Sequence, residues 1–119
     1  MSSRRLQRLN VLFQQELADL IAFHLRDPRL AELVSITRVE VSADLQNAHV
    51  HVSVLGDEEA KASTMTALQA AAPFLRRQLS ERLTIRRIPG LHFRLDESIE
   101  EAAHILELMK QVPEKKSPP

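Results

Sequence analysis

Residues His49 to Val54 alternate strictly between a polar side chain and valine. An alternation with a period of two is typical of a strand that buries one face and exposes the other. A second β-branched segment, 35–41, precedes it, and the short stretch between them holds Asp44 and Asn47, two residues that favour turns. The sequence therefore predicts an antiparallel hairpin. The side chains expected to face the core are Val39, Val41, Val50, Val52 and Val54.

Helical patterns lie on both sides of this hairpin. Apolar residues recur mostly at three- and four-residue steps from Arg4 to Arg26, which predicts a long amphipathic helix that ends before Pro28. A second helix is expected to begin near Asp57, because this residue and the two glutamates behind it suit the positive end of a helix. Pro73 interrupts that second pattern, so either a kink or two successive helices is expected.

The rest of the chain predicts one more strand and one more helix. Residues 91–95 alternate like a strand, and Ser98 with Glu101 three residues later forms a capping box that starts a last helix. The predicted fold class is α+β, with a three-stranded sheet and helices packed on one face, in a single domain of residues 1–112. The tail, 113–119, is rich in proline and lysine and is expected to be disordered.

Composition excludes several classes of protein. The 119 residues contain no cysteine, which excludes disulfide frameworks, thiolate catalysis and cysteine-bound zinc. The longest uncharged stretch, 62–75, is too short to span a bilayer, and the amino-terminal residues do not resemble a signal peptide, so a cytoplasmic protein is expected. Tryptophan and tyrosine are absent, and no base-stacking platform is expected. The phenylalanines assigned to the core are Phe13, Phe23, Phe74 and Phe93.

Positive charge is concentrated late in the chain, although 16 Lys and Arg balance 16 Asp and Glu overall. Residues 76–94 contain six arginines against one acidic residue, Glu81, whereas residues 96–107 contain five acidic residues and no Lys or Arg. Guanidinium groups bind phosphate through paired hydrogen bonds, so the arginine block suits a nucleic-acid backbone. An ordinary solvated face, with Arg77 paired to Glu81, explains it equally well. The block consists of Arg76, Arg77, Arg82, Arg86, Arg87 and Arg94.

Three further arginines, Arg4, Arg5 and Arg8, stand at the start of the first predicted helix. Cations at this end oppose the helix macrodipole by about 0.3–1 kcal/mol each. Their presence there indicates either a contact with an anionic partner or a role in solubility.

The histidines carry a rival hypothesis. His49 and His51 share one strand face, and His92 is expected on the same face of the third strand, so the three could hold a catalytic metal in a small metal-dependent enzyme. No carboxylate motif accompanies them, and exposed strand histidines explain the pattern better. His24 is expected to be a partly buried structural residue. Because no known catalytic or nucleotide-binding motif is present, no catalytic residue, metal or cofactor is expected.

Residues 86–98 read Arg-Arg-Ile-Pro-Gly-Leu-His-Phe-Arg-Leu-Asp-Glu-Ser and resemble the signature of the ribosome-binding factor A family. The positions that match the signature are Arg87, Pro89, Leu91, Phe93, Asp96 and Ser98. Three earlier stretches agree with the family in the same order: 26–30, 39–45 and 67–69. The resemblance covers about residues 4–110.

The resemblance implies a KH-like fold of the bacterial type (type II) without a GxxG loop. In place of that loop the family has an Ala-x-Gly kink between two helices, and here Ala71, Ala72 and Pro73 stand at those positions. Proline also breaks a helix, but it is stiffer than glycine and does not let a phosphate approach a bare backbone. The bend is therefore expected to survive without a backbone-mediated RNA contact.

The resemblance also implies a function. Members of the family are non-catalytic assembly factors that bind the free small (30S) ribosomal subunit, assist late maturation of its 16S ribosomal RNA and support growth in the cold. A monomer without a membrane partner is expected. The implied function favours the phosphate-binding interpretation of the arginine block. The RNA-binding residues expected are first Arg76, Arg77, Arg86 and Arg87, and second Arg4, Arg5, Arg8 and Arg94. A KH-like domain that binds another structured RNA is the alternative within the same class.

Overall fold

The predicted hairpin forms the centre of the structure, a computed structural model that describes residues 3–111. β1 (Val34–Val41) and β2 (Asn47–Val54) pair antiparallel, and β3 (Gly90–Leu95) lies on the other side of β2, parallel to it. The helices are α1 (Ser3–Phe23), α2 (Glu58–Arg82) and α3 (Ser98–Gln111). The predicted α+β class and three-stranded sheet are confirmed. The predicted tail, 113–119, lies outside the described residues.

The sheet buries one face and exposes the other, as the alternation predicts. Val50 of β2 lies opposite Val39 on β1 and Phe93 on β3, and all three side chains are buried. The register of β1 shifts between Ile36 and Arg38. An extra residue in a strand turns the following side chains over, so Ile36 and Val39, three positions apart, both face the core. This bulge explains why the alternation in 35–41 is only partial.

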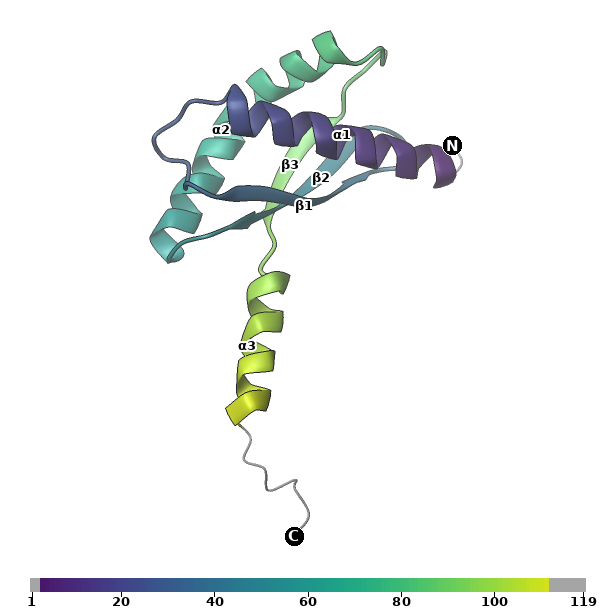
Figure 1. The fold of residues 1–119 in the computed structure, drawn as a ribbon. Coiled ribbons are helices and arrows are strands. Elements are labelled where there is room, and N and C mark those ends of the chain that lie inside the picture. Colours follow the sequence, from purple (N-terminus) through teal and green to yellow (C-terminus); the bar gives the residue numbers. More distant parts are fainter. Residues whose placement is uncertain (1–2, 112–119) are drawn as a thin grey trace.

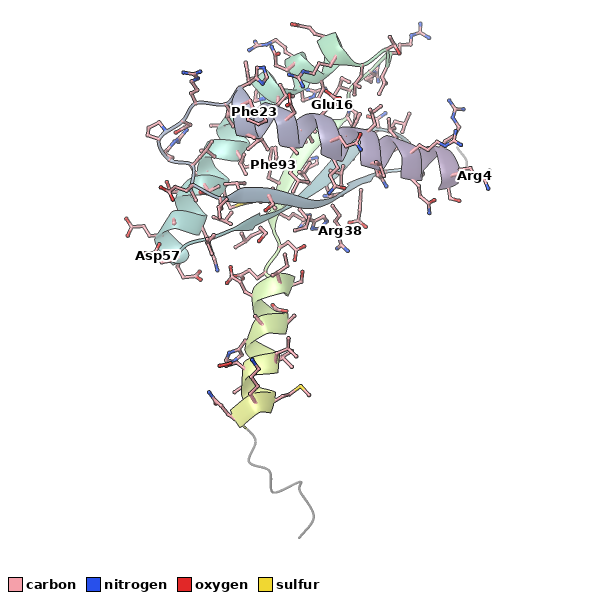
Figure 2. All side chains as sticks on the ribbon, in the orientation of Figure 1. Arg4, Glu16, Phe23, Arg38, Asp57 and Phe93 are labelled. Carbon is pink, nitrogen blue, oxygen red and sulfur yellow. The ribbon has the colours of Figure 1, made fainter. Side chains whose placement is uncertain are left out.

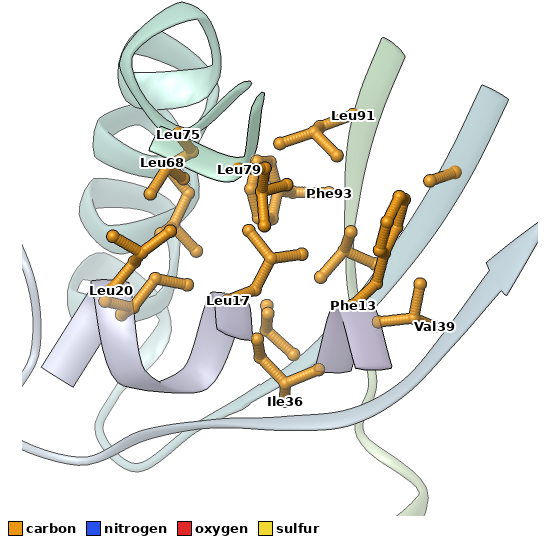
Figure 3. Close-up of a cluster of buried hydrophobic side chains, with 14 of the residues drawn as sticks. Phe13, Leu17, Leu20, Ile36, Val39, Leu68, Leu75, Leu79, Leu91 and Phe93 are labelled. Atoms are coloured by element: carbon orange, nitrogen blue, oxygen red, sulfur yellow. The ribbon is translucent and has the colours of Figure 1, made fainter. Parts of the chain in front are cut away.

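Two helices, α1 and α2, cover the apolar face of the sheet (Figure 1). Figure 3 shows their side chains meeting those of the strands in one continuous layer. Burying one leucine or phenylalanine side chain contributes about 1.5–3 kcal/mol, so this layer is the main source of stability. The helical side chains that are completely buried include Phe13, Leu17, Leu20, Leu68, Leu75 and Leu79. Within residues 3–111, no helix is both long and apolar enough to cross a membrane.

The carboxyl end of α1 contradicts two predictions. Phe23 was assigned to the core but is 72% exposed, and His24, expected to be partly buried, is exposed as well. The apolar stripe of α1 is completed by Leu20 and Ile21, and Phe23 lies off that stripe. The His24 backbone N–H still donates to the Leu20 carbonyl, but its side chain lies beside Asp19, with Nδ1 3.9 Å from the carboxylate, rather than in the core. Phe13 and Phe93 are buried as predicted, and Phe74 is partly buried against the core.

Helix α2 runs through Pro73 as one continuous helix. Its start follows the prediction: Asp57 is the N-cap, and its carboxylate accepts a hydrogen bond from the Ala60 backbone N–H at 2.8 Å. Figure 1 shows the helix changing direction between its first and second halves. Proline cannot donate the backbone hydrogen bond expected at its position, which favours a bend at this point. Of the two expected arrangements, the structure therefore has the kink rather than two separate helices.

Helix α3 does not join the layer formed by α1 and α2. Figure 1 shows it pointing away from the sheet, and none of its residues is buried. Several large apolar side chains are between 47% and 63% exposed: Ile99, Ile105, Leu106, Leu108 and Met109. The expectation that the helices pack on one face is thus correct for α1 and α2 and wrong for α3. Only two residues separate β3 from α3, and the start of α3 is held by Lys61, which donates to Glu97 and Glu100, and by Asp96, which accepts from Thr37 and the Ser98 N–H.

Side-chain amides from the helices close both open edges of the sheet. Asn10 of α1 accepts a hydrogen bond from the Val41 backbone N–H at 2.8 Å, and Gln14 donates to the Ile36 carbonyl at 3.1 Å. At the other edge, Gln69 of α2 accepts from the Phe93 backbone N–H at 3.1 Å. Edge strands with free backbone groups can pair with other chains, and these amides satisfy three of those groups: the Val41 N–H, the Ile36 carbonyl and the Phe93 N–H.

The contact at the β3 edge leads to a stability prediction. Gln69→Ala removes the acceptor from the partly buried Phe93 N–H and should lower the free energy of unfolding by about 1–3 kcal/mol in urea denaturation. Gln15→Ala is the matched control, because Gln15 is exposed on α1 and makes no hydrogen bond to another side chain or strand in residues 3–111. Equal stability of the two variants would contradict the role assigned to Gln69.

Candidate nucleic-acid interface

The structure divides the arginine block into separate groups. Arg76 and Arg77 lie on α2 after the kink, Arg86 and Arg87 lie on the loop that returns to β3, and Arg94 lies on β3. All of these arginines are exposed, as are those at the start of α1. Figure 2 shows Arg4 at the free end of α1, away from the sheet.

Arg82 differs from the other members of the block. Its guanidinium donates to the carboxylates of Glu16 at 3.1 Å and Asp19 at 2.8 Å, so it joins the end of α2 to the outer side of α1. The hydrogen bond to Asp19, and then that to Glu16, raises the pKa of Arg82 above its ordinary value. Arg82 therefore has a structural role. The ion pair expected between Arg77 and Glu81 is not formed in the described residues. At this end of α2 it is Arg82 that forms ion pairs, with Glu16 and Asp19 of α1.

A hollow of about 320 Å³ lies beside the kink, on α2. It is lined by Pro73, Arg76, Arg77, Ser80 and Ile88. Arg76 donates from Nη2 to the Ile88 carbonyl at 2.8 Å, which ties its side chain to the loop before β3. Arg77 makes no side-chain hydrogen bond or ion pair in the described part of the chain, so its donors remain available to an anion.

A larger cleft brings the two predicted arginine groups together. Arg5 and Arg8 of α1 line it together with Arg86 of the α2–β3 loop, although 78 positions separate Arg8 from Arg86 in the sequence. Its volume is about 420 Å³. Its other lining residues, Leu9, Leu12, Leu45, Thr84 and Ile85, are mostly apolar. The sequence reasoning named these arginines but missed the apolar residues between them, because the four apolar positions belong to three different elements.

Arg94 lies on the open face of the sheet, among the histidines. Its Nε donates to Nδ1 of His49 at 3.3 Å, and the rings of His49 and His92 are 5.4 Å apart. His92 is hydrogen-bonded to the side-chain oxygen of Asn47 at 2.8 Å, and His51 to Glu40 at 2.9 Å. No group of three His, Cys, Asp or Glu residues within 3–111 is arranged to hold a metal ion. The histidines thus contact their strand neighbours rather than converging on one point.

The predicted signature residues prove to be mainly structural. Pro89, Leu91 and Phe93 are buried. Asp96 joins three elements: its carboxylate accepts hydrogen bonds from the Thr37 hydroxyl at 2.6 Å and the Ser98 backbone N–H at 2.9 Å, and its own N–H donates to the Val52 carbonyl. The Thr37 hydrogen bond, followed by those from Ser98, holds the pKa of Asp96 well below its usual range. Helix α3 begins at Ser98, as predicted. The Ser98 backbone N–H is bound by the Asp96 carboxylate, however, and not by Glu101 as the predicted capping box required.

A family comparison agrees with this arrangement. The family model described as Ribosome-binding factor A matches residues 5–109. The chain belongs to the ribosome-binding factor A family.

Individual relatives extend the ribosome-binding factor A match to sequence and fold. Ribosome-binding factor A of Acetivibrio thermocellus is 44% identical over 107 residues, which cover 90% of this chain and 87% of the relative. A solution structure from Thermotoga maritima, a putative ribosome-binding factor A, has a TM-score of 0.72 at 34% identity and covers 84% of this chain and 94% of that chain. A homology model of the Thermus thermophilus ribosome-binding factor A has been fitted into a cryo-EM map of its complex with 30S. Its TM-score is 0.61 at 30% identity, and the match covers 74% of this chain and 91% of that chain.

The Asp96 junction leads to a pH prediction. Because the folded-state pKa of Asp96 lies below its ordinary value of 3.8, its ionised form stabilises the fold above about pH 4, and this contribution is lost as the pH falls further. Between pH 5 and 2, unfolding free energies measured in urea should therefore decrease more steeply for the parent than for Asp96→Asn. Thr37→Val removes the main hydrogen-bond donor to Asp96, so the unfolding free energy of this variant should also decrease less steeply with falling pH than that of the parent. Parallel curves for all three proteins would contradict the role of this carboxylate.

Proposed function

We propose that this protein is a non-catalytic assembly factor that binds the free small ribosomal subunit and assists late maturation of its 16S ribosomal RNA in the cytoplasm. The observation that carries the proposal is the structural likeness to the Thermus thermophilus factor that has been fitted into a 30S complex. The family match over residues 5–109 supports the same partner for this chain.

The proposed contacts are made by guanidinium groups on ribosomal RNA phosphates. Arg76 and Arg77 beside the kink, with Arg86 and Arg87 on the following loop, are the main candidates. Each guanidinium can donate two parallel hydrogen bonds to one phosphate, which suits arginine better than lysine for this task. The secondary candidates are Arg4, Arg5, Arg8 and Arg94.

Charge segregation gives the bound protein an orientation. α3 and the segment before it carry Asp96, Glu97, Glu100, Glu101 and Glu107. Carboxylates repel phosphates, so the arginine-bearing side, formed by α2 and its loop, should face the RNA while α3 points away from it. Figure 1 shows α3 on the opposite side of the sheet from the second half of α2, as this orientation requires.

The proposed mode of action is occupancy of one RNA conformation. A protein that binds one state of the maturing RNA more tightly than another shifts the population toward that state, and it leaves when the RNA adopts the state that it binds less well. No covalent step is required. At the kink, Pro73 offers no backbone N–H, so we assign phosphate binding there to the Arg76 and Arg77 side chains.

The ionisable groups support a non-enzymatic role. In residues 3–111, each clearly displaced pKa is explained by a structural contact. The carboxylate of Asp27 has its pKa lowered to about 2 by the hydrogen bond from Arg29, and Glu100 and then Glu97 raise the pKa of Lys61. Lys61, whose Nζ lies 2.8 Å from both glutamates, anchors α3 to α2. Displaced groups often mark catalytic sites, but here Lys61, Arg82 and Asp96 join neighbouring elements, and Asp27 and Asp44 hold local turns.

The salt dependence of subunit binding tests the proposal. Arg77→Ala combined with Arg87→Ala should reduce the slope of log affinity against log salt by roughly 0.7–0.9 for each phosphate that the variant no longer neutralises. The measurement is binding to purified small subunits over a range of salt concentrations. Stability should stay near that of the parent, because both side chains are exposed.

The matched control removes the same charge elsewhere. Arg26→Ala with Lys110→Ala also deletes two exposed positive charges, one after α1 and one on α3, and should retain the parent's slope. An unchanged slope in the Arg77 and Arg87 variant, or an equal reduction in the control, would refute the assignment of these phosphate contacts.

A further inference from the structure

The 420 Å³ cleft at the start of α1 combines two kinds of surface. Arg5, Arg8 and Arg86 line it together with several apolar side chains, and we call these apolar residues its floor. The floor residues are Leu9 and Leu12 of α1, Leu45 of the β1–β2 turn and Ile85 of the α2–β3 loop. This volume lies within the usual range for small-ligand sites, roughly 300–1,000 Å³.

Leu45 reaches this floor through an unfavourable backbone conformation. Its φ is 60°, the only positive φ of a non-glycine residue within residues 3–111. The turn is held by hydrogen bonds from the Leu45 N–H to the Ser42 carbonyl, and from the Ser42 hydroxyl and Gln46 N–H to the Asp44 carboxylate. Glycine or asparagine would adopt this conformation at lower energy. Leu45 packs against the hydrophobic core in spite of this conformation, and it adds an apolar side chain to the lining of the cleft.

A phosphate alone would not need the apolar floor. Neither Arg8 nor Arg86 has a hydrogen bond or ion pair with another residue in the described chain, so their charge is available to a ligand. The cleft therefore suits a ligand with one apolar part and one anionic part. A nucleotide has both, and unstacked bases of RNA are recognised by stacking on guanidinium planes as well as on aromatic rings.

We propose that this cleft binds one unstacked base of single-stranded RNA, with the base on the apolar floor and its flanking phosphates on Arg8 and Arg86. The proposal rests on the proposed function and adds a base site to it. It assigns to the turn residue Leu45 and to Leu12 a direct contact with RNA. The hollow at Arg76 and Arg77 is a separate contact that binds phosphate without a base.

The first test compares two strands with equal numbers of phosphates. One is an oligouridylate, and the other has the same length but consists only of abasic ribose phosphates. The parent protein should bind the oligouridylate roughly fivefold more tightly, because a base on the apolar floor removes apolar surface of both partners from water. Equal affinity for the two strands would overturn the base site, whereas the proposed function would be judged separately from the salt dependence of binding to small subunits.

Variants on α1 locate the site. Leu12→Ser removes an apolar side chain from the floor and should abolish the preference for the oligouridylate without changing the affinity for the abasic strand. Leu12 is 36% exposed, and the adjacent Val11, 53% exposed, does not line the cleft, so Val11→Ser is the matched control and should keep the preference. A preference that survives Leu12→Ser, or disappears in Val11→Ser, would overturn the location.

A measurement on the unaltered protein avoids any effect of the substitutions on folding. Methyl NMR signals of Leu12, Leu45 and Ile85 should shift with the oligouridylate and not with the abasic strand, because only a base ring produces ring-current shifts. Equal shifts with both strands would overturn the proposal. Sedimentation without RNA must show a monomer, since a dimer that Leu12→Ser dissociates would identify a second copy as the occupant and overturn the proposal as well.

Discussion

Parallel pairing of β3 with β2 is the constraint on which the rest of the structure depends. Parallel neighbours cannot be joined by a tight turn, so a long connection must cross the sheet, and α2 with its following loop is that connection. The crossover covers the apolar face that α1 leaves open. It also carries Arg76 and Arg77 past the kink and returns Arg86 and Arg87 to the sheet beside α1. The candidate RNA-binding groups are therefore placed by the same segment that completes the core.

Structural roles and proposed RNA contacts are divided between neighbouring residues of one sequence block. In 86–98, the residues that identify the family are chiefly those that build the β3 strand and its junction with α3: Leu91 and Phe93 are buried, and Asp96 is bonded to Thr37 and Ser98. The exposed arginines beside them carry the proposed RNA contacts. A family signature can thus depend mainly on folding requirements, while the proposed RNA contacts lie on adjacent surface side chains.

Polar side chains stabilise the edges of the sheet and the start of α3, which the hydrophobic core does not reach. Asn10, Gln14 and Gln69 close the sheet edges, and Lys61 holds the first turn of α3 through two glutamates. These interactions are directional and few. Removing one of them leaves a backbone group or a charge without a partner, which is more damaging than removing an exposed side chain. The Lys61 contacts also hold α3 as an acidic projection that points away from the sheet.

Local patterns in the sequence determined the elements of this protein, and the tertiary structure decided which of their surfaces meet. Alternation in 49–54 predicted β2, and Asp57 predicted the start of α2, because period and capping depend on residues close together in the chain. The same local reasoning placed Phe23 in the core and α3 on the sheet, and both predictions were wrong, because burial depends on which elements pack together. Only the folded chain brings Arg8 next to Arg86 and pairs Arg82 with α1. Arg82 lies more than 60 positions from its partners, and Arg86 lies 78 positions from Arg8, so both arrangements come from the packing of α2 and its following loop against α1 and not from any local pattern.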